Sequence, residues 1–221
     1  MIFVLGDSHS GLFNGLGKIP MPGPHNYDTL PGYRTYSIGT IVSCLFYEKQ
    51  FKGVLKILKE KVNKEQDWVL MTVGETNFRY DFLLFAKQNK VNVFDVVEEW
   101  FLLYFAAVKK LRSYGYKVCV FSSHPTTNNE PDPHPSHPIE QNVYVRNMVG
   151  LYWNKLAKQY CEAFNIAYAS IYEDILKDDY SSDDTYFQDF CHLNTKILPI
   201  ATERVEEAIR NKLQCSTHTE K

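Results

Sequence analysis

The sequence predicts a single α/β domain built around a mainly parallel β-sheet. Two observations lead to this fold class: short apolar segments typical of buried strands alternate with longer amphipathic segments, and several strand segments end in small or polar residues. A chain of 221 residues with 44% hydrophobic and 23% charged residues can bury one core of ordinary composition. We assign residues 1–214 to this domain and residues 215–221 to a polar C-terminal tail.

Five segments have the composition of strands that are covered on both faces. They are short and rich in β-branched or aromatic residues, and Gly74 follows one of them directly. In chain order the expected strands are Ile2–Leu5, Tyr33–Ser37, Asp67–Val73, Tyr116–Ser122 and Ile166–Ser170. A five-stranded sheet is therefore expected.

Four segments between these strands have apolar residues at helical spacing. The expected helices are Phe51–Val62, Val93–Leu111, Gln141–Phe164 and Asn194–Leu213, the last with Asn194 or Thr195 as N-cap. Two stretches do not fit the alternation and are expected to be loops. Gly11–Gly32 is rich in Gly and Pro, whereas Ser123–Ile139 is rich in Pro and His and long enough to suggest a functional or mobile loop.

Charge and hydropathy exclude several classes of function. The formal net charge is −2 and the Lys and Arg residues are spread along the chain, so no nucleic-acid-binding surface is expected. No apolar run approaches the roughly 20 residues of a membrane span, and no secretory signal fits the N-terminus. The 5 cysteines are far apart and form no CxxC pair, which favours reduced thiols and a cytoplasmic protein, with export inside a larger particle left open.

Small and polar residues follow three of the expected strands. Gly6-Asp7-Ser8 follows the first, Gly39 follows the second, and Gly74-Glu75-Thr76-Asn77 follows the third. Ligands bind beyond the carboxyl ends of the strands in an open parallel sheet. These residues are therefore expected to gather at one functional edge.

A serine nucleophile needs a base, and that base needs an orienting partner. Asp189 and His192 are three positions apart near the C-terminus, so that one turn can place the carboxylate against the imidazole. A DxxH pair alone is a weak signal because it often occurs by chance. Combined with Gly6-Asp7-Ser8, the mid-chain Gly39 and the G-x-x-N segment Gly74–Asn77 in this order, it becomes a stronger signal for catalysis by a serine nucleophile.

These motifs together resemble those of the SGNH hydrolases, the superfamily that includes the GDSL esterases. The resemblance rests on Gly6-Asp7-Ser8, Gly39, Gly74 with Asn77, and Asp189 with His192, and it spans nearly the whole chain. It implies a flavodoxin-like three-layer α/β/α sandwich and hydrolysis of esters, often acetyl esters on carbohydrates. It requires no metal and no cofactor, because the base and the hydrogen-bond donors supply the activation.

The resemblance also implies residue roles. Ser8 is the nucleophile, His192 the general base and Asp189 its orienter. The oxyanion hole consists of the backbone N–H groups of Ser8 and Gly39 and the side-chain amide of Asn77.

One motif departs from the family pattern. The usual G-x-N-D segment has Asn two residues after Gly, but here Thr76 holds that place and Asn77 follows it. Thr76 or Glu75 could therefore line the site instead. The chain most resembles a subgroup with GDSH at the nucleophile and a GE motif at the third site, and in that subgroup Arg79 would be a further polar group near the site.

Residues around the motifs have both functional and structural interpretations. The residues expected to contact substrate are Asp7, His9, Gly74, Glu75, Thr76 and Arg79. In the structural interpretation Ser8 is a helix N-cap, Asp7 bonds turn N–H groups, and Gly39 is an ordinary turn glycine. For His9, packing or substrate contact is favoured over a role as base.

The resemblance therefore implies a serine esterase that cleaves short acyl esters, with acetyl expected, on a small molecule or a glycan through an acyl-serine intermediate. One alternative is an acyltransferase of the same fold. Another is a non-catalytic carbohydrate-binding or structural protein, for example on a virus particle. A metal hydrolase using His134 and His137 is less favoured, because the prolines around this pair stiffen the loop and no helix carries it.

Overall fold

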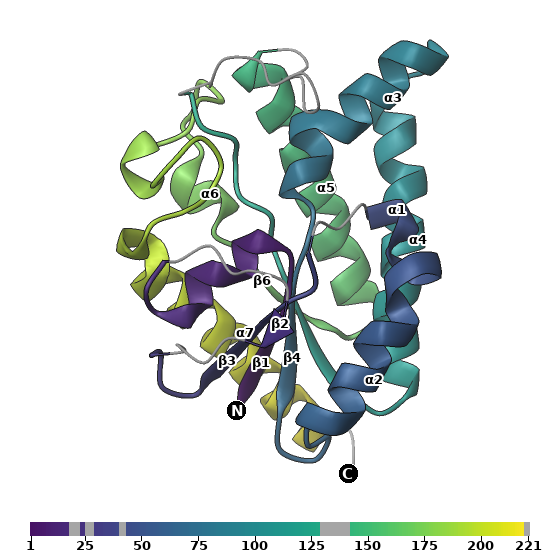
Figure 1. The fold of residues 1–221 in the computed structure, drawn as a ribbon, viewed down its shortest axis with the longest axis vertical. Helices are drawn as coiled ribbons and strands as arrows, with labels where there is room; N and C mark the ends of the chain where they lie inside the picture. The colour runs from purple at the N-terminus through teal and green to yellow at the C-terminus, as the bar shows by residue number, and fades with distance from the viewer. Residues whose placement is uncertain (18–22, 25–28, 40–42, 129–141, 219–221) are drawn as a thin grey trace.

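The structure is a computed structural model that describes residues 1–17, 23–24, 29–39, 43–128 and 142–218. A six-stranded sheet with the order β2-β3-β1-β4-β5-β6 forms its centre, and helices cover both faces (Figure 1). The three-layer α/β/α sandwich expected from the sequence is confirmed.

Five strands are parallel and correspond to the five expected segments. They are β1 (Ile2–Gly6), β3 (Tyr33–Ser37), β4 (Trp68–Thr72), β5 (Lys117–Phe121) and β6 (Ala167–Ala169). These five strands have the flavodoxin-like order β3-β1-β4-β5-β6. The chain adds β3 on one side of β1 and then adds β4, β5 and β6 on the other side. The sixth strand, β2 (Gly23–Pro24), pairs antiparallel with β3 at the edge of the sheet.

The four expected helices are present, with small shifts at their ends. They are α2 (Phe51–Lys61), α4 (Val93–Ser113), α5 (Val143–Ala163) and α7 (Leu198–His218). A 3₁₀ turn, η5 (Thr195–Ile197), precedes α7, and the Asn194 side chain caps this turn by accepting from the Lys196 N–H at 2.9 Å. Because α7 continues to His218, it includes the first part of the segment that was expected to be a loose tail.

Several short elements were not predicted. They are the 3₁₀ helices η1 (Ser8–Asn14) and η4 (Asp184–Tyr186), the π-helical segments η2 (Phe46–Gln50) and η3 (Asn77–Asp81), and the helices α1 (Ser43–Leu45), α3 (Phe82–Asn89) and α6 (Tyr172–Ile175). The expected loop Gly11–Gly32 thus contains part of η1 and all of β2. None of the helices in the described ranges is long and apolar enough to cross a membrane.

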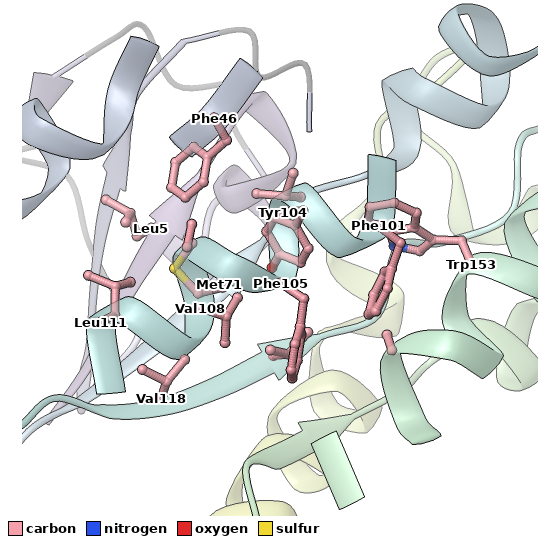
Figure 2. Close-up of a cluster of buried hydrophobic side chains, with 14 of the residues drawn as sticks. Leu5, Phe46, Met71, Phe101, Tyr104, Phe105, Val108, Leu111, Val118 and Trp153 are labelled. Carbon is pink, nitrogen blue, oxygen red and sulfur yellow. The ribbon is translucent and has the colours of Figure 1, made fainter. Parts of the chain in front are cut away.

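The side chains of the sheet alternate between two buried clusters. In β1, Phe3 and Leu5 face the cluster under α2, α4 and α5, whereas Val4 faces the cluster under η1 and α7. The first cluster is rich in aromatic rings: Phe101 of α4 packs edge-to-face on Trp153 of α5 with ring centroids 5.1 Å apart (Figure 2). Burial on both faces explains why the strands appear in the sequence as short apolar runs.

The ends of the central strands are level with one another. Gly6 at the end of β1 pairs with Ser37 of β3 on one side and with Thr72 of β4 on the other. A Cβ atom on Gly6 would lie 1.9 Å from Thr72 Oγ1, so only glycine fits at this position. The residues that follow β1 and β4 therefore leave the sheet at the same edge, at the point where the strand order reverses.

Candidate active site

A cavity with about 470 Å³ of empty volume lies at the carboxyl edge of the sheet, partly open to solvent. Its wall comes from the segments after β1, β4 and β5 and from the turn before η5. The lining residues that matter below are Asp7, Ser8, His9, Gly74, Glu75, Ser123, His124 and His192. The position agrees with the general rule for open α/β sheets.

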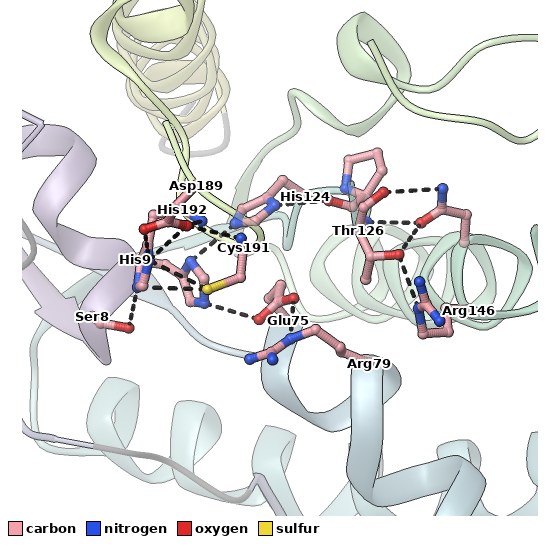
Figure 3. A network of polar contacts seen from close by, with 12 residues as sticks. Ser8, His9, Glu75, Arg79, His124, Thr126, Arg146, Asp189, Cys191 and His192 are labelled. Carbon is pink, nitrogen blue, oxygen red and sulfur yellow. Dashed lines mark hydrogen bonds and ion pairs between the residues drawn. The ribbon is translucent and has the colours of Figure 1, made fainter. Parts of the chain in front are cut away.

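Ser8, His192 and Asp189 form a continuous hydrogen-bonded row at this cavity (Figure 3). Ser8 Oγ is 2.9 Å from His192 Nε2, although 184 positions separate the two residues. His192 Nδ1 is 2.9 Å from Asp189 Oδ2 and 3.1 Å from Oδ1. These distances are those of hydrogen bonds, and the order of the groups, a hydroxyl, an imidazole and a carboxylate, is the one that catalysis by a serine nucleophile requires.

Ser8 is the first residue of η1, and its neighbour Asp7 makes the cap. Asp7 Oδ1 accepts from the His9 N–H at 3.0 Å, and the Asp7 carbonyl accepts from Ser10 Oγ at 2.7 Å. The structural interpretation of Asp7 as a turn-forming residue thus agrees with the structure. The Ser8 hydroxyl is not the cap of η1, and it lies against His192.

Asp189 builds the turn that carries His192. One of its oxygens, Oδ1, accepts from the Cys191 N–H at 2.9 Å and the His192 N–H at 2.7 Å. Burial alone would raise the pKa of Asp189, but these N–H groups and the imidazole outweigh burial and lower it below the ordinary value. Asp189 is therefore a carboxylate at neutral pH.

Hydrogen-bond directions fix the tautomer of His192. Because the Asp189 carboxylate can only accept, His192 Nδ1 carries the proton and Nε2 presents its lone pair to the Ser8 hydroxyl. Burial, and after it the charge of His9, lowers the pKa of His192, with Asp189 partly offsetting both. The imidazole is thus in the form that can accept the proton of Ser8.

A second row of charged groups lies behind the triad. Arg79 Nε donates to Glu75 Oε1 at 2.8 Å, and Glu75 Oε2 is 3.0 Å from His9 Nε2. His9 Nδ1 is in turn 3.0 Å from His124 Nε2. Burial would raise the pKa of Glu75, but Arg79 and His9 outweigh it and lower this pKa, so Glu75 is an anion with only 1% of its side chain exposed.

His124 enters the cavity on an extended segment after β5, and polar residues of α5 hold that segment. Asn154 Oδ1 accepts from the Ser123 N–H at 3.1 Å, and Asn147 Oδ1 accepts from the Thr126 N–H at 2.7 Å. Both asparagines are buried. These side chains accept hydrogen bonds from backbone N–H groups that have no partner in a neighbouring strand. The segment can therefore be buried without regular secondary structure.

Five of the residues expected at the site line the cavity beside His192, namely Asp7, Ser8, His9, Gly74 and Glu75. Thr76 is not among the lining residues. Arg79 reaches the site through Glu75, and its guanidinium also lies 5.6 Å from the centre of the Phe190 ring.

The structure does not support Asn77 as an oxyanion-hole donor. Its side chain is completely buried and is committed elsewhere: Oδ1 accepts from the Ser43 N–H at 3.2 Å, and Nδ2 donates to Asp81 at 2.8 Å. The first of these bonds ties η3 to α1, and the second lies within η3. Gly39 has a left-handed φ of 80° and its N–H lies 3.4 Å from Ser37 Oγ, and it does not line the cavity.

The sequence-based assignment missed the contributions of Ser123, His124 and Gln188 to the cavity wall. Ser123 and His124 follow the end of β5 after Ser122, so the rule that was applied to the ends of β1 and β4 would have found them. His134 and His137, considered above as metal ligands, lie outside the described residues.

Asp189, Cys191 and His192 offer ligand atoms within 4.8 Å of one another, the only such group found among the described residues. The donors do not suit a metal ion. Both Asp189 oxygens already accept hydrogen bonds, and burial raises the pKa of the Cys191 thiol well above its ordinary value, so that it stays protonated.

Solved structures share this fold at low sequence identity. A Bacteroides fragilis protein proposed to be an acylhydrolase is 13% identical over 96% of this chain and 87% of its own, with a TM-score of 0.59. A GDSL-like lipase from Bacteroides thetaiotaomicron is 14% identical over 95% and 87%, with a TM-score of 0.57. A catalytic mutant of Axe2, an acetylxylan esterase from Geobacillus stearothermophilus, is 16% identical over 96% and 92%, with a TM-score of 0.51.

No protein-family model matches the chain, and no curated protein matches it. The structural neighbours include GDSL-like proteins, and the fold that the motifs implied is therefore confirmed.

Proposed function

We propose that this chain is a serine ester hydrolase of the SGNH type and that Ser8 forms an acyl-enzyme intermediate. The observation that carries this proposal is the Ser8–His192–Asp189 row, with contacts of 2.9 Å on both sides of the imidazole, at the edge of a cavity. The fold alone would not carry it, because one fold hosts many functions.

Acylation starts with proton transfer from Ser8 to His192. The Ser8 oxygen attacks the acyl carbon as its proton moves to His192 Nε2, and the imidazolium that forms is stabilised by the Asp189 carboxylate. His192 then gives this proton to the leaving alcohol, the bond between the acyl carbon and the alcohol oxygen breaks, and an acyl-serine remains.

Deacylation repeats these steps with water. His192 takes a proton from a water molecule, the resulting oxygen nucleophile attacks the acyl-serine, and the acid is released as Ser8 regains its proton. Donors to the oxyanion would stabilise both tetrahedral intermediates, and each is worth about 2.7–4 kcal/mol of the barrier. The N–H group of Ser8 remains the proposed donor. Gly39 is no longer proposed because it does not line the cavity and its N–H faces Ser37 Oγ, and Asn77 is no longer proposed because its amide bonds Ser43 and Asp81.

A short acyl group on a carbohydrate is the proposed substrate class. The acyl carbon must reach Ser8 in a narrow cavity whose wall includes Leu12 and Leu193 beside glycines, which suits a small apolar group. Two of the structural neighbours are described as acetylxylan esterases, and this makes an acetyl ester the first substrate to test.

The decisive comparison is p-nitrophenyl acetate hydrolysis by the wild type and by Ser8→Ala. The variant should lose at least about 10³-fold in kcat/KM, because the nucleophile acts together with its base. Ser113→Ala is a matched control, since this serine is exposed at the end of α4 and its hydroxyl bonds only the Lys110 carbonyl in the structure. Equal rates for the wild type and Ser8→Ala would refute the proposal.

The same assay separates the alternative functions. An acyltransferase would acylate Ser8 but would consume the ester faster when a sugar acceptor is added. A non-catalytic carbohydrate-binding protein would show no turnover that depends on Ser8.

A further inference from the structure

His9 lies between the proposed general base and a buried ion pair, and the triad leaves its role open. Its ring stacks on His192 with centroids 4.9 Å apart and planes at 30°. Its other neighbour is His124, whose ring meets it edge-on with centroids 4.7 Å apart. Only 10% of the His9 side chain is exposed.

The contacts of His124 determine the proton on one nitrogen of His9. His124 Nδ1 is 2.9 Å from the Pro125 carbonyl, which can only accept, so His124 Nδ1 carries a proton. Burial lowers the pKa of His124 to about 3, so the ring is neutral and its Nε2 has a lone pair and no proton. The 3.0 Å contact with His9 is therefore a hydrogen bond donated by His9 Nδ1–H.

Glu75 determines the proton on the other nitrogen. Its carboxylate accepts from Arg79 at 2.8 Å and stands 3.0 Å from His9 Nε2. An anion can face that nitrogen at this distance favourably only if Nε2 also carries a proton. Both nitrogens of His9 are then protonated, and the ring is an imidazolium.

From this geometry we propose that His9 is a positioning residue, a cation clamped by Glu75 and His124 that fixes the ring plane of His192 and keeps this base unprotonated. The proposal deepens the proposed function and rests on it. The titratable and charged groups that face the two stacked rings are Asp7, Glu75, Arg79, His124, Asp189 and Cys191.

Like charges on stacked rings repel, so a charged His9 should lower the pKa of His192. Burial and, after it, the charge of His9 disfavour protonation of His192, so the pKa of His192 lies below its ordinary value of 6.5. Since the base must be neutral, kcat/KM falls as the pH drops through this pKa. The acid limb of the wild-type profile is therefore expected below pH 6.5.

Two variants show whether Glu75 affects the pKa of His192 through His9 or directly. His9→Gln removes the cation but keeps an amide that can bond Glu75, and the acid limb should move up by roughly one pH unit. Glu75→Gln lets His9 lose its proton, so the limb should also move up. If Glu75 instead acted directly on His192, removal of its negative charge would move the limb down.

Asp174→Asn is the matched control for Glu75→Gln. It removes the charge that Asp174 shares with Arg204, whose Nη2 lies 3.1 Å from Asp174 Oδ1. This substitution should leave the acid limb of the pH–rate profile in place. The double variant His9→Gln/Glu75→Gln should match His9→Gln alone, because Glu75 then has no cation to hold.

Nitrogen-15 NMR of the histidine side chains in the wild type makes the test independent of activity and of variant folding. At pH 7 His9 should be protonated on both nitrogens, and His192 only on Nδ1. Titration of His192 in the wild type and in His9→Gln should show the same displacement as the pH–rate profiles. A neutral His9 at pH 7, or a downward move in Glu75→Gln, would overturn the proposal.

The readouts distinguish the two proposals. A protein with a charged His9 and a displaced His192 titration but no Ser8-dependent turnover would keep the charge arrangement and refute the esterase. Ser8-dependent turnover with a neutral His9 would support the esterase and refute the charge arrangement.

Discussion

At the scale of single residues, Asp189 combines a structural and a chemical task. It caps the turn that carries His192 and it sets the tautomer of the ring. In Asp189→Asn the amide oxygen can still accept the turn N–H groups, but the amide N–H₂ would face His192 Nδ1 and force the proton onto Nε2. The lone pair that Ser8 needs would be lost, and kcat should fall by about 10⁴-fold with the fold retained.

A second aspartate offers the control for this substitution. Asp179 also caps a turn, since its Oδ1 accepts from the Ser181 N–H at 2.9 Å, and no imidazole contacts it within the described part of the chain. Asp179→Asn should therefore keep full p-nitrophenyl acetate hydrolysis. An Asp189→Asn enzyme with wild-type kcat would show that the carboxylate does not control the tautomer.

The sequence identified those site residues whose position depends on strand ends and short turns. Ser8 follows a buried strand, and Asp189 and His192 share one turn, so both placements follow from local spacing. Asn77 could not be placed in this way, because its side chain bonds the Ser43 N–H, a partner 34 positions away that local spacing does not reveal. His124 was missed as part of the cavity although it also follows a buried strand, β5, to which the same rule of strand ends applies.

At the scale of elements, Gly74 joins β4 to the segment that carries Glu75. It has a φ of 132°, and a Cβ atom there would lie 2.4 Å from Ser123 Oγ and 3.0 Å from Trp153 Nε1. Gly74→Ala would combine backbone strain with overpacking, and the free energy of unfolding should fall by about 2–4 kcal/mol. Chemical denaturation monitored by circular dichroism measures this change.

Gly53 provides the opposite case within the same protein. It lies in α2 with no atom within 4 Å of a Cβ and with an ordinary φ. Gly53→Ala should raise the free energy of unfolding by about 0.5–1 kcal/mol, because it only removes freedom from the unfolded chain and a poor helix former from a helix. Equal effects of the two substitutions would contradict the packing assigned to Gly74.

The elements that the sequence predicted are those with a clear apolar pattern. The parallel strands are buried on both faces and the long helices have one apolar face, so each leaves a signal in the sequence. In α3, Phe82 and Leu83 are buried while Phe85 is exposed, so apolar residues point in several directions and the pattern carries no period. The strand β2 has only 2 residues, too few for any pattern.

At the scale of the whole molecule, the site is assembled from distant parts of the chain. Ser8 follows the first strand, Glu75 and His124 follow the two strands beyond it in the sheet, and His192 precedes the last helix. No local segment contains a complete nucleophile and base. The chemistry therefore depends on the folded sheet, and the strand order, which sequence spacing alone does not determine, brings the parts together.

The most direct test of this account is labelling with a fluorophosphonate probe followed by mass spectrometry. Folded wild-type protein should carry the adduct on Ser8 and lose esterase activity in proportion to labelling. The same protein unfolded in guanidinium chloride should not react, because His192, 184 positions away, would no longer activate the hydroxyl. An adduct on any other residue, or equal labelling of folded and unfolded protein, would contradict the claim that Ser8 and His192 act together.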